Sequence, residues 1–85
     1  MFRIEISRVA RRYLERLDNP TRRRIGTAID ELGNNPFEGD VRRLEGEPNL
    51  HRKRVGDFRI LFRIDRSQRL IRIEAIRPRG EAYKP

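Results

Sequence analysis

The residues from 58 to 64 carry the clearest structural signal in this chain. Large apolar side chains stand at every second position, with arginine or leucine between them. A period of two is the pattern of a β-strand that buries one face, and here it leaves arginine on the other. Gly56-Asp57 directly before it predicts a tight turn, and Leu50 to Val55 predicts the strand that pairs with it. We therefore expect an antiparallel sheet built around residues 58–64.

Two further segments alternate between apolar and polar residues. Phe2 to Ile6 predicts an early strand, and Leu70 to Ile76 predicts the last one. Strict alternation in the last strand places Ile73 and Ala75 on one face, and Glu74 and Ile76 on the other.

Apolar residues recur at helical spacing in the two stretches that follow the first strand. Ser7 fits the N-cap of a helix over residues 8–17, and Pro20 opens a second helix. Gly33-Asn34-Asn35-Pro36 ends that helix, since glycine and asparagine accept a left-handed backbone. Val41 to Leu44, in the turn-rich segment that comes next, is a candidate edge strand.

The predicted order is β-α-α-β-β-β, which indicates an α+β fold with an α-hairpin packed on an antiparallel sheet. A chain of 85 residues supports one small core, so we expect residues 1–85 to form a single domain. The chain has no Cys, no signal-peptide pattern and no apolar run near the ~18 residues of a membrane span. We expect a cytoplasmic protein without disulfides.

Positive charge is concentrated in the last 35 residues. The whole chain has a net charge of +8, and residues 51–85 hold nine Arg and two Lys against four acids. Arginine grips phosphate with a planar fork, and residues of one parity on neighbouring strands share a face, so several cations can gather opposite the helices. The pattern favours a polyanionic partner, although an arginine-rich surface is also typical of GC-rich or heat-adapted organisms.

The common catalytic constellations are missing from the sequence. One His, no Cys, and two serines placed in a cap and a turn leave no candidate for a nucleophile with its base. The carboxylates of the last 35 residues lack metal-ligand spacing, and the glycines are scattered instead of forming a phosphate loop. We therefore predict no metal and no cofactor.

Three segments together resemble one family: residues 41–46, 51–64 and 73–83. The most specific pieces are the turn from Arg54 to Arg59 and the terminal Arg79-x-x-x-Tyr83. In this order they resemble the RelE/ParE superfamily of bacterial and archaeal toxins from type II toxin–antitoxin systems, RelE-like branch. The resemblance spans nearly the whole chain.

The RelE resemblance implies a metal-independent endoribonuclease that cuts mRNA in the ribosomal A site and so inhibits translation. In that reaction the 2′-hydroxyl attacks the adjacent phosphate and leaves a 2′,3′-cyclic phosphate. Carried over by position, Arg59 holds the scissile phosphate, Arg77 stabilises charge or protonates the leaving oxygen, Tyr83 is the general base, and Arg52 adds a further catalytic cation. The implied RNA-binding residues are Lys53, Arg54, Arg79 and Lys84.

The chain departs from the RelE pattern at Leu50, where a basic residue is expected, and His51 is a secondary candidate base. Two other functions therefore stay open: a ParE-like inhibitor of DNA gyrase, and a non-toxic RNA-binding relic. The resemblance implies as partners an acidic or amphipathic antitoxin, the ribosome and mRNA, and no membrane.

Overall fold

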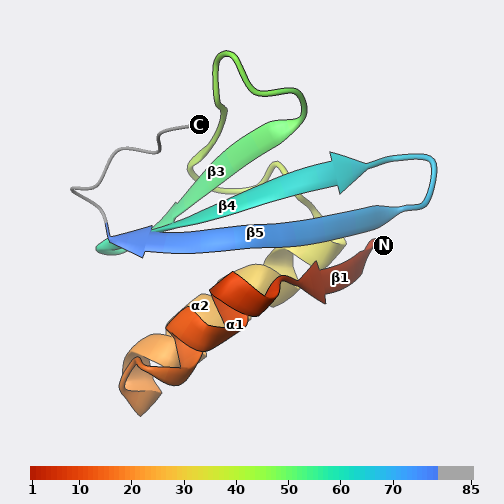
Figure 1. Ribbon diagram of the computed structural model, residues 1–85. Coiled ribbons are helices and arrows are strands. Elements are labelled where there is room, and N and C mark those ends of the chain that lie inside the picture. Colours follow the sequence, from red (N-terminus) through yellow and green to blue (C-terminus); the bar gives the residue numbers. More distant parts are fainter. Residues whose placement is uncertain (79–85) are drawn as a thin grey trace.

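The computed structural model describes residues 1–78 and shows a layer of two helices against one sheet (Figure 1). In chain order the elements are β1 (Arg3–Ile6), α1 (Arg8–Glu15), α2 (Asn19–Asn34), β2 (Val41–Arg43), β3 (Leu50–Val55), β4 (Phe58–Asp65) and β5 (Leu70–Pro78). The predicted α+β fold is confirmed, and the candidate edge strand is present as β2. Neither helix is long and apolar enough to cross a membrane.

The sheet is mixed, in the order β1-β5-β4-β3-β2. The four later strands pair antiparallel as predicted, but β1 lies parallel to β5 at the edge of the sheet. The sequence predicts the antiparallel pairing of the later strands but assigns no partner to the first strand. Alternation identifies a strand but carries no information about its partner, and the intervening elements supply the long connection that a parallel pair requires.

Both helices begin at the side-chain caps that their sequences provide. Ser7 Oγ accepts from Ala10 N at 3.1 Å, and Asp18 Oδ1 accepts from Thr21 N at 2.9 Å. The second helix therefore begins at Asn19, one residue before the predicted start.

The predicted left-handed end of α2 is wrong, because no residue between Gly33 and Pro36 has a positive φ. Gly33 is needed instead for close approach of β1. Phe2 N donates to the Gly33 carbonyl oxygen at 2.8 Å, and a Cβ on Gly33 would lie 3.3 Å from the Phe2 carbonyl oxygen. Glycine at this position lets the start of the chain pack directly on the helix.

A β-bulge divides β5. Leu61 pairs with Ala75 but Phe62 pairs with Ile73, so Glu74 is an extra residue opposite the β4 backbone. The predicted alternation is therefore wrong after Ile73, because Ile76 faces the helices and Ala75 faces away. The bulge is held by the cap of α1: Ser7 Oγ donates to the Glu74 carbonyl oxygen at 2.7 Å.

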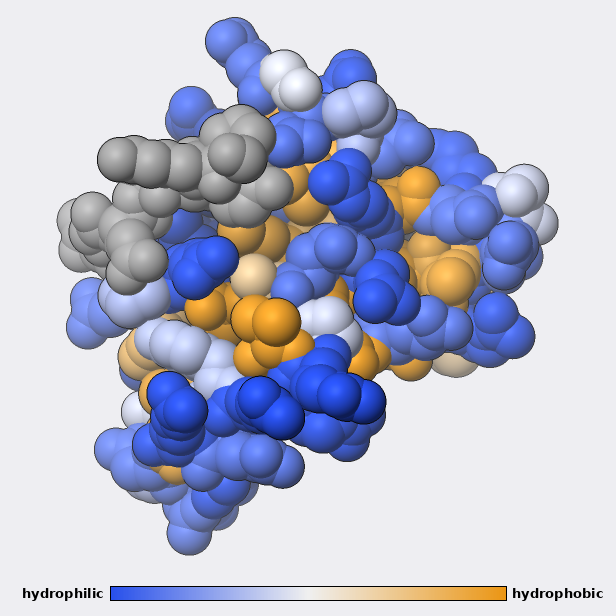
Figure 2. Space-filling model, viewed as in Figure 1, coloured by the Kyte–Doolittle hydropathy of each residue, from blue (hydrophilic) through white to orange (hydrophobic). Residues whose placement is uncertain are grey.

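Within residues 1–78, helices pack on only one of the two faces of the sheet. The face toward α1 and α2 carries the main core, in which Phe62 is fully buried (Figure 1). The opposite face, called the open face here, has no helix over it within residues 1–78 and carries a small apolar cluster of Leu50, Leu61 and Ala75. Figure 2 shows hydrophilic side chains over most of the face in view, with apolar ones visible where the sheet meets the helices.

Candidate functional site

Three arginines stand side by side across the open face. Arg54 of β3 lies directly opposite Arg59 of β4, which in turn lies opposite Arg77 of β5. Directly opposed residues on antiparallel strands share a face, and Arg59 and Arg77 are each two residues from a member of the open-face apolar cluster. We call Arg54, Arg59 and Arg77 the arginine row.

The middle arginine of the row has an unsatisfied donor. Arg59 Nε is buried and has no hydrogen-bond partner among the described residues. Leaving a buried donor unpaired costs about 1–3 kcal/mol, and here the flanking side chains are also cationic. An anion on the open face would satisfy this donor and reduce the repulsion within the row.

Arg52 lies on the same face but is already bound to a carboxylate. Its side chain is buried, and Nη1 donates to both the carboxylate Oδ1 and the carbonyl oxygen of Asp40 at 3.1 Å. The second carboxylate oxygen of Asp40 is 3.8 Å from Arg54 Nε. The hydrogen bond from Arg52, helped by the charge of Arg54, lowers the pKa of Asp40 below its ordinary value. Asp40 therefore joins Arg52 to the edge of the arginine row.

The structure does not bring Lys53 or His51 to this row. Lys53 is buried on the helix-covered face, where its Nζ lies 3.1 Å from Glu31 Oε1 of α2. The His51 ring stacks on Phe62 of the main core, with ring centroids 5.5 Å apart. Both point to the face opposite Arg52, as residues next to it on a strand must.

Position 50 is part of the apolar cluster instead of the cationic site. Leu50 is 1% exposed and packs with Leu61 and Ala75. The arginine row thus borders apolar surface, where charges interact more strongly than in open water.

The remaining predicted site residues lie outside the described residues: Arg79, Tyr83 and Lys84. Sequence reasoning missed Asp40, since it stands in a turn-rich segment twelve residues before its partner Arg52 and follows no motif. Its only signal is its place directly before the candidate edge strand. Within residues 1–78, no three His, Asp or Glu side chains converge as metal ligands would.

Known proteins share both the sequence pattern and the fold. Residues 4–83 match the family model of the ParE toxin of the type II toxin–antitoxin system parDE. The chain is 30% identical over 86 residues to a candidate toxin, RelE1, of Methanocaldococcus jannaschii, and the match covers 98% of this chain and 96% of that protein.

Two solved structures show the same fold. The archaeal RelE–RelB complex of Pyrococcus horikoshii matches with a TM-score of 0.82 and 30% identity, covering 95% of this chain and 98% of that one. The toxin–antitoxin complex RelBE2 of Mycobacterium tuberculosis matches with a TM-score of 0.82 and 22% identity, covering 92% and 98%. The family-model match and the M. jannaschii relative each span nearly the whole chain, and therefore the protein belongs to the RelE/ParE family of type II toxins.

Proposed function

We propose that this toxin is a ribosome-dependent endoribonuclease that cuts mRNA in the ribosomal A site. The observation that supports this most is the arginine row, because the buried Nε of Arg59 has no partner in the described chain and faces the open side of the sheet. A phosphodiester offers the oxygen acceptors that this donor lacks.

The reaction needs stabilisation of charge more than it needs a nucleophile from the protein. The 2′-oxygen of the RNA attacks the adjacent phosphorus, the bond to the 5′-oxygen breaks, and a proton passes to that leaving oxygen. Negative charge builds on the non-bridging oxygens in the transition state. In our proposal Arg59 and Arg77 donate to those oxygens, and donors placed in this way are each worth about 10²–10³ in rate.

Proton transfer is the second requirement, and for it we carry over the family's assignment. Tyr83 takes the proton of the 2′-hydroxyl, which requires neighbouring cations such as Arg77 and Arg79 to favour the phenolate. Arg77 supplies the proton to the leaving 5′-oxygen, the alternative role that the family resemblance implies for it. Arg54, Arg79 and Lys84 contact the RNA backbone in this scheme. Arg52 acts more indirectly, since its guanidinium is held by Asp40.

The proposed partner is a cognate antitoxin. The similar protein of P. horikoshii was solved as a complex of RelE with RelB. A net charge of +8 favours an acidic or amphipathic partner that covers the open face, and opposite charges would speed the encounter.

The test is induction of the wild type, Arg77→Ala and Tyr83→Phe in cells without antitoxin, with mapping of mRNA 5′ ends. We expect the wild type to arrest growth and cut mRNA within codons, and both variants to lose this while staying folded. Arg11→Ala is the matched control, because Arg11 is an exposed arginine on α1.

Two results would contradict the proposal. Intact mRNA with accumulating gyrase-cleaved DNA would identify a gyrase inhibitor, the function favoured by the ParE name of the matching family model. Normal growth at full induction would identify a non-toxic relic, to which the apolar Leu50 points.

A further inference from the structure

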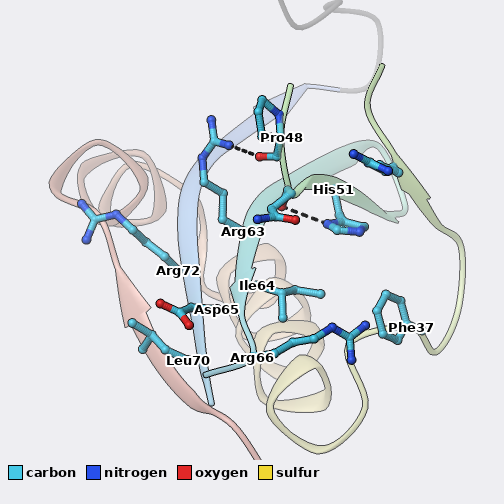
Figure 3. A pocket seen from close by; sticks show the side chains of 11 residues that line it. Phe37, Pro48, His51, Arg63, Ile64, Asp65, Arg66, Leu70 and Arg72 are labelled. Carbon is cyan, nitrogen blue, oxygen red and sulfur yellow. Dashed lines mark hydrogen bonds between the residues drawn. The ribbon is translucent and has the colours of Figure 1, made fainter. Parts of the chain in front are cut away.

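A groove of about 910 Å³ lies at the other end of the sheet from the arginine row (Figure 3). It opens where β3 begins, β4 ends and β5 begins. Of the candidate site residues named from the sequence that lie within residues 1–78, the groove includes only His51, the secondary candidate base. Its floor includes Ile64, and its rim includes Phe37, Arg43, His51 and Arg66.

One side of the groove is a flat aromatic surface. Phe37 is 49% exposed, and the guanidinium of Arg66 lies over its ring, 5.5 Å from the centroid. Figure 3 shows Arg66 extending from the end of β4 toward Phe37, with His51 close by. The His51 ring is 5.9 Å from Phe37 and is fixed by its Nδ1, which donates to the Asn49 carbonyl oxygen at 3.1 Å.

In the described part of the chain, four arginines line the groove, and two of them form ion pairs with glutamates while the other two do not. Arg63 lies 3.6 Å from Glu47, and Arg72 lies 3.3 Å from Glu5 and 2.9 Å from Glu74. Arg43 and Arg66 have no carboxylate partner among residues 1–78. Both are exposed and line the groove, and Arg66 lies against Phe37. The described lining holds these four arginines and one carboxylate, that of Asp65, which accepts hydrogen bonds from Ser67 and Gln68, so the lining carries a net positive charge.

We propose that this groove binds a nucleotide of single-stranded RNA, with its base stacked on the Phe37–Arg66 surface and its phosphate on Arg43 and Arg66. Exposed aromatic rings interleaved with arginine are the usual platform for unpaired bases, because every base has a flat face and every nucleotide carries an anion. An acidic peptide would use the cations but offers no flat base to stack on the Phe37–Arg66 pair.

This inference rests on the proposed function, since the RNA is the same mRNA that is cut at the arginine row. Arg63, at the edge of the groove, is four residues along β4 from Arg59, which corresponds to about 13 Å. One RNA strand can reach both places. The groove then binds a nucleotide near the scissile phosphate but does not contact that phosphate itself.

The first experiment measures RNA affinity in the absence of cutting. Fluorescence anisotropy follows binding of a fluorescein-labelled ten-nucleotide RNA whose 2′-hydroxyls are all methylated, so that the 2′-oxygens cannot attack. We expect Phe37→Leu to weaken binding by about fivefold or more, since stacking on an aromatic ring contributes this much. Phe37→Tyr keeps the flat ring and should stay within about twofold of the wild type.

The second experiment measures the charge contacts through their salt dependence. In Arg43→Gln and Arg66→Gln, the slope of the logarithm of affinity against the logarithm of salt concentration should become shallower by about 0.7 for each lost phosphate contact. Arg11→Gln on α1 is the control and should leave the slope unchanged. Thermal melting of each variant verifies that the fold is intact.

Two outcomes separate this inference from the proposed function. If the wild type cuts no mRNA but Phe37→Leu still weakens binding of the methylated RNA, the proposed function fails and the nucleotide groove stands. If Phe37→Leu and Arg66→Gln leave RNA affinity unchanged, the inference is overturned, and reduced antitoxin binding by the same variants would identify the groove as a protein-docking site.

Discussion

Arg52 and Lys53 are neighbours on β3, and both are buried, on opposite faces of the sheet. Each is bound to a carboxylate, Asp40 for the first and Glu31 for the second. Arg59, on the adjacent strand, has a buried Nε with no partner in the described chain. The first two cations are satisfied within the fold and tie the edge strand and α2 to the sheet. The third has no partner within residues 1–78, and this difference separates two cations bound within the fold from the one that we propose contacts the RNA phosphate.

The largest expected effect comes from removing the unpaired cation. Arg59→Ala should lower the single-turnover rate of mRNA cleavage on programmed ribosomes by about 10²–10³, because a donor to the transition-state phosphate is lost. The free energy of unfolding should change by less than about 1 kcal/mol, since the variant also removes an unsatisfied buried donor. A large loss of stability with retained cleavage would show that Arg59 stabilises the fold, as Arg52 and Lys53 do, and does not act on the RNA.

Removing the carboxylate partner of a buried cation should lower stability and leave cleavage almost unchanged. In Glu31→Ala, the buried ammonium of Lys53 loses its partner, and the free energy of unfolding should fall by about 2 kcal/mol. This is below the usual cost for a buried pair because Glu31 is half exposed and partly hydrated. Urea unfolding measures the change, and cleavage should stay within about twofold of the wild type. Glu38→Ala is a control at an exposed glutamate that forms no ion pair within residues 1–78.

Arg52 tests the boundary between the two classes, because it lies on the open face but is held by Asp40. Arg52→Met keeps an unbranched side chain of similar length in the buried site and removes the charge. We expect cleavage to fall by about tenfold, less than for Arg59→Ala, since this guanidinium acts at a distance from the phosphate. A loss as large as that of Arg59→Ala would place Arg52 in direct contact with the substrate.

The smallest effect is the pH dependence of stability that Asp40 contributes. Its pKa is held below the ordinary 3.8 by Arg52, so its stabilising contribution is present above pH 3.8 and is lost as the pH falls through the lowered pKa. Melting temperatures of the wild type and Asp40→Asn should therefore converge as the pH falls below 3.8. A constant difference down to the lowest pH would show that the carboxylate charge is not involved.

The local features of the fold could be predicted from the sequence. The alternation in β4, the Gly56 turn and the Ser7 cap each depend on residues close together in the chain. The face shared by Arg54 and Arg59 follows from the same turn, because a tight hairpin fixes which residues lie opposite one another.

The unpredicted features all depend on contacts between distant segments. Asp40 and Glu31 reach partners 12 and 22 residues away, and no spacing rule connects them. The parallel pairing of β1 with β5 is decided by how the helices pack, which alternation within a strand does not encode. The same holds for the groove, whose described residues come from four strands and from the three connections between α2, β2, β3, β4 and β5 that hold Phe37, residues 48–49 and Arg66.

The bulge at Glu74 shifts the alternation of β5 by one residue, so different sequence positions face the helices before and after it. Before Glu74, the odd-numbered Ile71 and Ile73 face the helices; after it, Ile76 does, and the odd-numbered Arg77 faces the open side. Under uninterrupted alternation, Arg77 would share the side of Ile73 and would leave the arginine row. The bulge takes up the extra residue, so β5 keeps Ile71, Ile73 and Ile76 toward the helices and Arg77 on the open face. Deleting Glu74 would leave a regular strand with Ile73 and Ile76 still toward the helices and Arg77 still on the open face, so the bulge accommodates one extra residue without moving either set.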